Sequence, residues 1–159
     1  MAGSLIRSAI LDGAAELIRA QGARPATIAR QAGIPMAALA DPDLLVQASA
    51  VLRFFEIAAA QCRLPNWGLS LARGSRLAAM IGPLWILLRN ARTVGQMCDE
   101  LADNFDLYSD AAMVSVERIK GGALLNWTTT RAMHESERQM AEFALSVLAS
   151  EIRSHLSRD

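Results

Sequence analysis

The chain offers few side chains that could do acid–base or metal chemistry. Its two histidines, His134 and His155, have no second histidine, cysteine or carboxylate at the spacing of a metal site, and HExxH, GxSxG, P-loop and GxGxxG motifs are absent. The run His134-Glu135-Ser136-Glu137 has the residue types of an acid–base cluster. Serine and glutamate together are also typical of the capped first turn of a helix, which is the interpretation we favour. We therefore expect no enzyme, no catalytic residue, no metal and no cofactor.

The cysteines, the hydropathy and the net charge limit the compartment and the partners that we expect for this protein. Cys62 and Cys98 lie in apolar helical patterns without CxxC spacing, which indicates buried thiols in a reducing compartment. No run approaches 18 apolar residues, and the start of the chain lacks the features of a signal peptide. Lys+Arg and Asp+Glu balance at 16 each, which disfavours nucleic-acid binding by this chain alone. We expect a cytoplasmic protein that does not bind membranes.

Residues 27–40 have the order helix, glycine turn, second helix that is typical of a helix-turn-helix. This region resembles the N-terminal part of TetR-type repressors. Over residues 1–45, however, four arginines balance four acids, and the second helix has no donor for a base edge or a phosphate. We favour a plain helical corner, and a TetR-like DNA-binding repressor is the alternative.

Aromatic and methionine side chains could line a pocket for a small molecule. The expected pocket residues are Trp85, Arg89, Met97, Phe105, Tyr108, Met113 and Trp127, with Met80 as a further adaptable filler. Arg89 follows the most apolar segment and could orient an anionic ligand, although it would also suit the C-terminal end of a helix dipole. Each apolar residue could instead belong simply to the core. Such a lining suits a hydrophobic or amphipathic ligand better than a sugar.

The first half of the chain is predicted to consist of helices. Apolar pairs every four residues predict an amphipathic helix from Leu5 to Ile18. A second helix is expected to end at Gly33, where a left-handed cap needs a residue without a Cβ. Asp41-Pro42-Asp43 predicts the start of a long helix that runs to about Cys62.

The second half of the chain adds a pair of strands. A short helix is expected after Pro65, an apolar helix after Gly82-Pro83, and a third helix from a capping box of Thr93 and Gln96. Residues 111–119 alternate apolar and polar, and with 123–130 across Lys120-Gly121-Gly122 they predict a β-hairpin. A final helix is expected over about 135–157.

These elements show no alternation of strand and helix and no internal repeat, so the predicted fold class is α+β, mostly α. At 159 residues and 52% hydrophobic composition, the chain suits one domain that folds without staples. We divide it into a helical part over about 1–63 and a helix-plus-hairpin part over about 64–159.

An ordered set of motifs resembles the arabinose-binding-type N-terminal domain of AraC-family transcription regulators. The motifs are Gln31-Ala32-Gly33-Ile34, Leu39-Ala40-Asp41-Pro42-Asp43, Trp67-Gly68-Leu69-Ser70-Leu71, Gly82-Pro83-Leu84 and Asn90-Ala91-Arg92-Thr93-Val94-Gly95, followed by the hairpin and the closing helix. Arg92 departs from the family pattern, because a small residue or proline is common before that threonine.

The resemblance implies a domain that binds a small-molecule effector and forms a homodimer. In this family such a domain controls a C-terminal pair of helix-turn-helix units over roughly 100 further residues, about the size of another small domain. Those units are absent from the 159 residues, so DNA would be bound only through that domain. The chain would be either part of a longer regulator or a stand-alone sensor.

Overall fold

The computed structural model describes residues 4–130 and 137–156. Its helices are α1 (Ala14–Ala20), α2 (Pro25–Ala32), α3 (Ala48–Gln61), α4 (Trp67–Ala72), α5 (Leu77–Ile81), α6 (Leu84–Arg89), α7 (Val94–Asn104) and α8 (Arg138–Leu156), and its strands are β1 (Leu5–Arg7), β2 (Leu45–Gln47), β3 (Ala112–Ile119) and β4 (Gly122–Thr129). Single 3₁₀ turns cover Ser8–Leu11, Met36–Leu39 and Phe105–Leu107. The fold is α+β and mostly α, as the sequence predicts.

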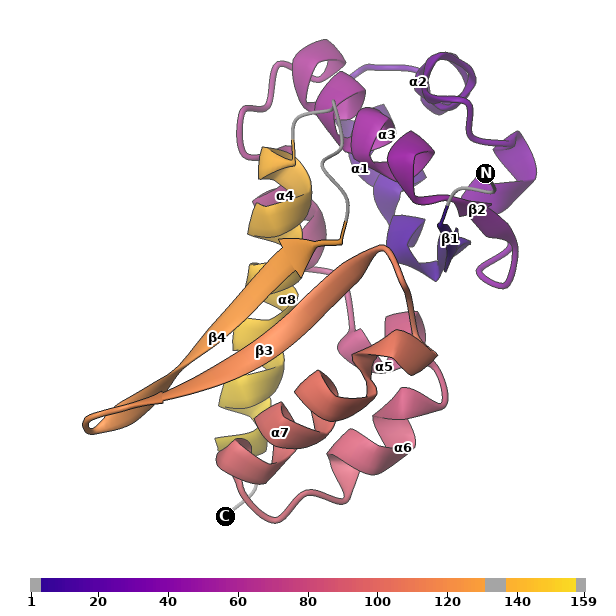
Figure 1. Ribbon diagram of the computed structural model, residues 1–159. Helices are drawn as coiled ribbons and strands as arrows, with labels where there is room; N and C mark the ends of the chain where they lie inside the picture. The colour runs from indigo at the N-terminus through magenta and orange to yellow at the C-terminus, as the bar shows by residue number, and fades with distance from the viewer. Residues whose placement is uncertain (1–3, 131–136, 157–159) are drawn as a thin grey trace.

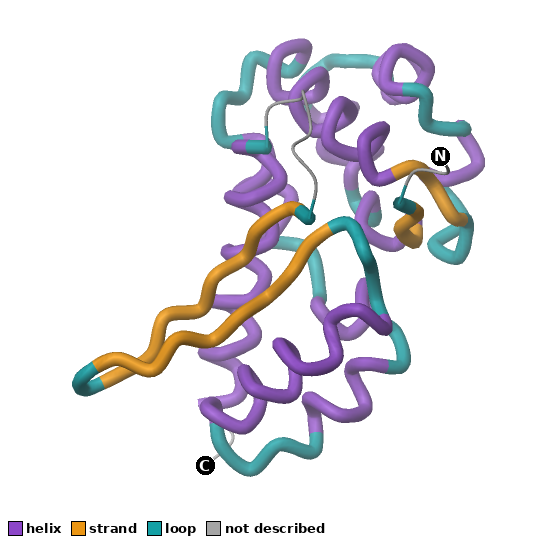
Figure 2. The backbone as a smooth tube through the Cα atoms, in the orientation of Figure 1, coloured by secondary structure: helices purple, strands orange, loops and turns teal. Residues whose placement is uncertain are grey.

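Helix α8 joins two groups of elements. The strands β1 and β2 lie with α1, α2 and α3 at one end of the molecule, and α5, α6 and α7 lie at the other (Figure 1). α8 runs along both groups and packs against α3, α4, α5 and α7. The helices make up most of the backbone, and the two small sheets, β1–β2 and β3–β4, lie apart from each other (Figure 2). One apolar core runs through the molecule and includes residues from Ile6 to Leu148.

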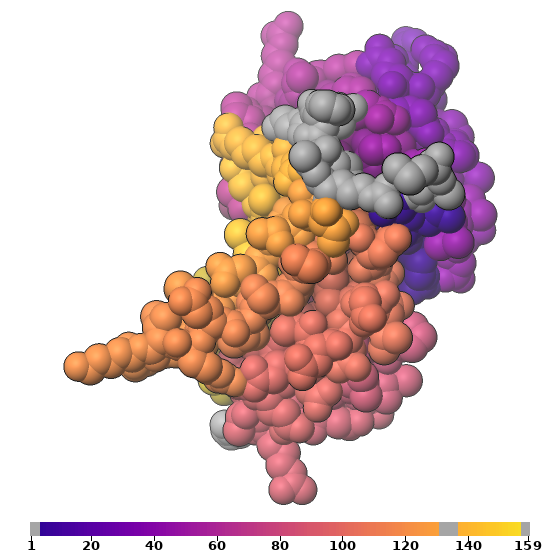
Figure 3. Space-filling model, viewed as in Figure 1, coloured from indigo at the N-terminus to yellow at the C-terminus, as the bar shows by residue number. Residues whose placement is uncertain are grey.

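The predicted hairpin is present with a two-residue turn. β3 and β4 are antiparallel, with Ile119 opposite Gly122, and Gly121 has the positive φ of 81° that such a turn requires. Val114 is buried and faces the half-buried Trp127, whereas Met113 is exposed, so the predicted alternation holds. The base of the hairpin packs on α7 and α8, and its tip projects from the body (Figure 3).

The predicted helix from Leu5 to Ile18 is wrong over its first half. Residues 5–7 form β1, and the helix proper begins after Gly13, whose φ of 76° is incompatible with a continuous right-handed helix. β1 pairs antiparallel with β2, with Ile6 opposite Val46. Both of these side chains are buried, which explains why an apolar segment of this length adopts a strand here.

The predicted helix start at Asp41-Pro42-Asp43 is also wrong. These residues form a turn before β2, in which the Asp41 carboxylate accepts a hydrogen bond from the Asp43 N–H at 3.0 Å, and α3 begins only at Ala48. An aspartate before proline suits both a helix start and a turn, because its side chain caps nearby N–H groups in either case. Because residues 45–47 pair with β1 as strand β2, Asp41-Pro42-Asp43 forms a turn and not a helix start.

Several local predictions are confirmed. α2 ends at Gly33 with a left-handed φ of 79°, and α6 begins directly after Gly82-Pro83. The Thr93 hydroxyl accepts a hydrogen bond from the Gln96 N–H at 3.1 Å and caps α7. The Gln96 side chain accepts from the Arg92 N–H at 3.0 Å, one residue before its usual partner in a capping box.

Helices α4 and α8 approach each other closely at Gly68. A Cβ added to Gly68 would lie 2.1 Å from the Gln139 carbonyl oxygen. The Gln139 side chain accepts a hydrogen bond from the Gly68 N–H at 2.9 Å and donates one to the Pro65 carbonyl at 2.7 Å. This buried clamp explains the glycine of the Trp67–Leu71 motif. The helix start expected at His134-Glu135-Ser136, and the end of that helix expected at about residue 157, lie outside the described residues.

Candidate functional site

An apolar cavity lies where the two ends of the molecule meet α8. Its volume is about 80 Å³, and it is partly open to the surface. The walls come from β1 and the 3₁₀ turn after it, α3, α5, the segment 105–112, β4 and α8. Met80 of α5 and Met140 and Phe143 of α8 are among the lining side chains. The cavity therefore brings together segments from both ends of the sequence.

Three of the seven predicted pocket residues line this cavity. Trp127 lines the cavity because side chains along β4 alternate between the two faces of the hairpin, and Trp127 lies on the inner face. The 3₁₀ turn over 105–107 brings Phe105 against Tyr108. The two rings meet edge to face, with centroids 5.4 Å apart and planes at 72°. This arrangement is favourable for aromatic pairs and holds the Tyr108 ring in place.

The other four predicted residues lie elsewhere. Met97 is buried inside α7 and Trp85 is half-buried on α6, but neither lines the cavity. Arg89 is exposed at the end of α6, and Met113 is 58% exposed on the outer face of β3. The cation expected to orient a ligand is therefore not at the cavity.

The hydroxyl of Tyr108 is a buried polar atom of the lining without a hydrogen-bond partner among the described residues. The ring is partly exposed, but the hydroxyl end is enclosed. Burial raises the pKa of Tyr108 far above its ordinary value, and the positive charge of Arg7 opposes this shift. The phenol therefore stays protonated at neutral pH and can donate a hydrogen bond.

The other two polar side chains of the lining already have partners. The Ser109 hydroxyl accepts a hydrogen bond from the Ala111 N–H at 3.1 Å, and the Thr129 hydroxyl donates one to the Glu137 carboxylate at 2.8 Å. No charged side chain is among the lining residues that the structure describes. Tyr108 is thus the polar side chain of this lining that has no hydrogen-bond partner among the described residues.

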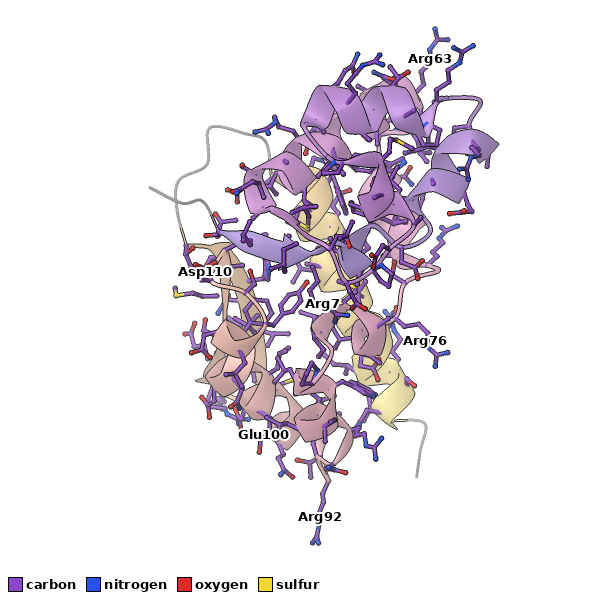
Figure 4. The ribbon with its side chains drawn as sticks, turned by 90° about the vertical axis from the view of Figure 1, so that its right-hand side faces the viewer. Arg7, Arg63, Arg76, Arg92, Glu100 and Asp110 are labelled. Atoms are coloured by element: carbon purple, nitrogen blue, oxygen red, sulfur yellow. The ribbon has the colours of Figure 1, made fainter. Side chains whose placement is uncertain are left out.

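Arg7 lies close to the site without lining it. It forms an ion pair with Asp43, and its guanidinium packs over Gly82, where an added Cβ would lie 2.7 Å from Nη1. Figure 4 shows Arg7 near the middle of the molecule, whereas Arg63 and Arg92 lie at its two ends. Arg7 therefore joins β1 to the turn before α6, and Gly82 leaves space for it.

Sequence reasoning missed the walls that come from β1, α3 and α8. Ile6, Val51, Phe143 and Val147 lie in segments predicted as helices, and nothing in their spacing separates a cavity wall from a filled core. Ser109 is 5% exposed between an aromatic turn and a strand, and its polar side chain gives no sign of this burial in the sequence.

A second hollow, of about 170 Å³, lies between α1 and α4. It is lined by six residues, including Asp12, Leu17 and Ser70, and it is more open than the apolar cavity. The Ser70 hydroxyl already donates to the Asn66 carbonyl at 3.1 Å. This hollow has no buried side chain that lacks a partner, so we take the apolar cavity as the candidate site.

The described part of the chain contains two free cysteines. Cys62 is buried, Cys98 is half-buried and both are free. Burial raises the pKa of both thiols, and Asp99 adds to the shift at Cys98 while Arg118 opposes it. Among the described residues, no group of three His, Cys, Asp or Glu side chains could hold a metal ion. None of the described helices has the length and apolar character needed to span a membrane.

The chain matches a known protein family over most of its length. Residues 22–159 match the family described as the arabinose-binding domain of AraC transcription regulators, N-terminal, and the chain belongs to this family. The resemblance drawn from the sequence motifs is confirmed.

Two relatives show the kind of protein in which such a domain occurs. The chain is 32% identical over 114 residues to the HTH-type transcriptional regulator VirS of Mycobacterium tuberculosis, in strains CDC 1551 and H37Rv. The alignment covers 72% of this chain and 33% of VirS. The chain thus spans about a third of the length of the curated relatives it matches.

Proposed function

We propose that this chain is the effector-binding and dimerisation domain of an AraC-type transcriptional regulator, and that the apolar cavity is its effector site. The observation that carries the proposal is the position of the cavity, which touches β1, α3, α5, β4 and α8 at once. A small molecule there would contact both ends of the domain. Family membership and the likeness to VirS support a role in transcription regulation.

Effector binding would act by fixing α8 against the rest of the domain. α8 contributes Met140, Phe143, Ala144, Val147 and Leu148 to the lining. A ligand that contacts these side chains and those of β1 and α3 stabilises one position of α8 over others. Such differential contact is what a ligand needs to shift a conformational equilibrium.

DNA binding belongs, in this proposal, to helix-turn-helix units outside these 159 residues, and the protein acts in the cytoplasm. The alternative of a TetR-like repressor has little support, because Met36–Leu39 is a single 3₁₀ turn where a recognition helix is needed. That turn carries no basic side chain.

Filling the cavity should change transcription without unfolding the protein. Ala144→Leu adds three carbon atoms at the cavity wall, which the existing space can accept with little overpacking. In the cell of origin, we expect transcript levels to change for the same genes that respond to deletion of the coding sequence. The measurement is transcript abundance in wild-type, deletion and Ala144→Leu strains.

The matched control is Ser150→Leu, which places the same side chain at an exposed position of α8. It should leave transcript levels at those genes unchanged. Protein level and melting temperature must stay close to wild type in both variants, so that a change in transcription does not report unfolding. The proposal fails if a stable Ala144→Leu protein leaves these transcripts at wild-type levels and responsive to the same growth conditions.

Dimerisation should be visible as mass in solution. Leu145 and Leu156 are 45% and 61% exposed, and their spacing of eleven residues, about three helical turns, places them on one face of α8. We propose this face as the dimer interface. Light scattering should give twice the chain mass of 17.1 kDa, and Leu145→Glu should return the monomer. A monomer at all concentrations would contradict this part of the proposal.

A further inference from the structure

Strand β4 has an outer edge that no other strand covers in the described part of the chain. β4 pairs with β3 alone, through eight consecutive residue pairs without a bulge. The tip of this hairpin projects from the body (Figure 3), and a two-stranded ribbon by itself is only marginally stable in water. The unpaired N–H and C=O groups of such an edge form a template on which a further strand can pair.

The register of the hairpin identifies the main-chain groups at this edge. The Thr130 N–H donates to the Ala111 carbonyl oxygen at 3.0 Å, so these two residues are a hydrogen-bonded pair. Such pairs alternate with non-hydrogen-bonded pairs along an antiparallel ladder, and the N–H and C=O groups of the latter point outward. The β4 residues with outward groups are Ala123, Leu125, Trp127 and Thr129. These four residues form no main-chain hydrogen bond to another described segment.

The two edges of the hairpin differ in how they are protected. Edge strands commonly carry charged side chains, proline or a bulge, and these features prevent pairing with another chain. β3 carries Glu117 and Arg118, and Arg118 forms an ion pair with Asp99 of α7, on which β3 packs. β4 has no charged residue and no proline over Gly122–Thr129. The edge of β4 is therefore open to pairing, whereas that of β3 is protected.

A second copy of the chain fits this open edge. Two antiparallel β4 strands related by a two-fold axis at Asn126 bring all four outward residues into hydrogen-bonded pairs. Leu125 then lies opposite the partner's Trp127, and aromatic–aliphatic pairs of this kind stabilise sheets. Because β4 is uncharged, no like charges face each other in this pairing. The edge is thus complementary to itself.

Helix α8 is placed favourably for the same arrangement. α8 packs on β4 and lies behind the hairpin in the view of Figure 1. A two-fold axis perpendicular to the joined sheet would put both copies of α8 on the same face of that sheet. Leu145 of α8 is 45% exposed and belongs to the face proposed above as the dimer interface. One partner would therefore cover both the strand edge and this helix.

We infer that the open edge of β4 joins two copies of the chain into a homodimer with a continuous four-stranded sheet, in the order β3–β4–β4–β3. This inference rests on the dimerisation proposed above, and it names the strand and the register that form the interface. The two Asn126 residues form the central, non-hydrogen-bonded pair, with Cα atoms about 4.5 Å apart. Ser115, which pairs with Asn126 inside the hairpin, lies one strand farther from the axis.

Cysteine cross-linking tests this register on the 159-residue chain. Asn126→Cys would bring two thiols within the Cα separation of about 4.4–6.8 Å that a disulfide requires. Under mild oxidation we expect most of this variant to run at twice the chain mass of 17.1 kDa on a non-reducing gel. Ser115→Cys is the matched control, because Ser115 is also exposed but would lie three strand spacings, about 14 Å, from its copy. The wild-type chain, with Cys62 and Cys98, gives the background.

A proline at the edge tests the hydrogen bonds themselves. Ala123→Pro removes an outward N–H but none of the hydrogen bonds to β3, and proline is tolerated at such an edge position. We expect the dissociation constant of the dimer to rise about tenfold or more, because each copy loses a donor. Ala123→Thr keeps the N–H and should dimerise like the wild type. Light scattering over a dilution series gives the constants.

The outcomes separate this interface from dimerisation as such. Cross-linking of Asn126→Cys no stronger than that of Ser115→Cys, or an unchanged dissociation constant in Ala123→Pro, would overturn the inference. Dimerisation through α8 would still stand if Leu145→Glu gave the monomer. A wild-type chain that is monomeric at all concentrations would overturn both proposals. Asn126 and Ala123 are exposed, so all of these variants should melt close to the wild type, which thermal unfolding checks.

Discussion

Replacing Gly68 with alanine is expected to lower the free energy of unfolding by more than about 3 kcal/mol. The added Cβ would lie 2.1 Å from the carbonyl oxygen of Gln139, a backbone atom that no rotamer change can move. Helices α4 and α8 would have to separate, which would also break the hydrogen bond from the Gly68 N–H to the Gln139 side chain. Chemical denaturation followed by circular dichroism measures the loss.

Gly74→Ala is the matched control for this variant. At Gly74 the nearest heavy atom to an added Cβ is 4.0 Å away, so alanine fits without contact. Alanine is also the better helix former by about 1 kcal/mol, and this preference would favour Gly68→Ala if local propensity decided the outcome. A Gly68→Ala protein as stable as Gly74→Ala would show that α4 and α8 do not approach as closely as described.

Trp67→Ala should destabilise the chain by about 3–5 kcal/mol, the range for removing a large aromatic side chain from a core. Trp67 is fully buried, and its ring meets Phe55 edge to face with centroids 5.0 Å apart and Phe54 at 6.0 Å. Phe55 in turn meets Phe143 of α8 at 5.2 Å. The variant would leave a void where α3, α4 and α8 meet, and thermal or chemical unfolding would report it.

Leu69→Ala on the same helix gives the comparison, because Leu69 is 38% exposed. Its cost should stay below about 1 kcal/mol. Equal costs for the two variants would mean that the aromatic cluster around Trp67 does not hold α4 in place. Trp67→Ala and Gly68→Ala together test the first two residues of the motif Trp67-Gly68-Leu69-Ser70-Leu71, on which the family resemblance partly rests.

The elements that the sequence predicted correctly are those that depend on residues close to one another along the chain. The Gly33 cap, the Thr93 cap and the turn at Gly121 each depend on residues within a few positions, and the structure has all three. The alternation along β3 and β4 likewise follows from a period of two and a tight turn. These features need no knowledge of distant contacts.

The pairing of β1 with β2 could not be predicted in this way. Each strand has three residues, too few to show a period, and the pairing joins Leu5–Arg7 to a segment some forty positions away. Apolar residues around Ile6 and Val46 fit a helix face as well as a strand. Only the tertiary contact, which buries both side chains, separates the two possibilities.

The candidate site likewise combines residues that the sequence predicted with residues that only the fold reveals. Phe105, Tyr108 and Trp127 stood out because aromatic residues are few in this chain, and they lie together at the cavity. The walls from β1, α3 and α8 consist of ordinary core residues, and no pattern marks them as facing an unfilled space. The unpaired state of the Tyr108 hydroxyl depends on all of these neighbours and is visible only in the assembled fold.

The most direct measurement is a methyl NMR spectrum of the chain labelled at its methionines, recorded with and without acetophenone as a small aromatic probe of the apolar cavity. Met80 and Met140 line the cavity, whereas Met36 and Met113 are 49% and 58% exposed and lie outside the lining. We expect the methyl signals of Met80 and Met140 to shift with rising acetophenone while those of Met36 and Met113 stay in place. Shifts confined to Met36 or Met113, or no shift at any methionine, would contradict an effector site in this cavity.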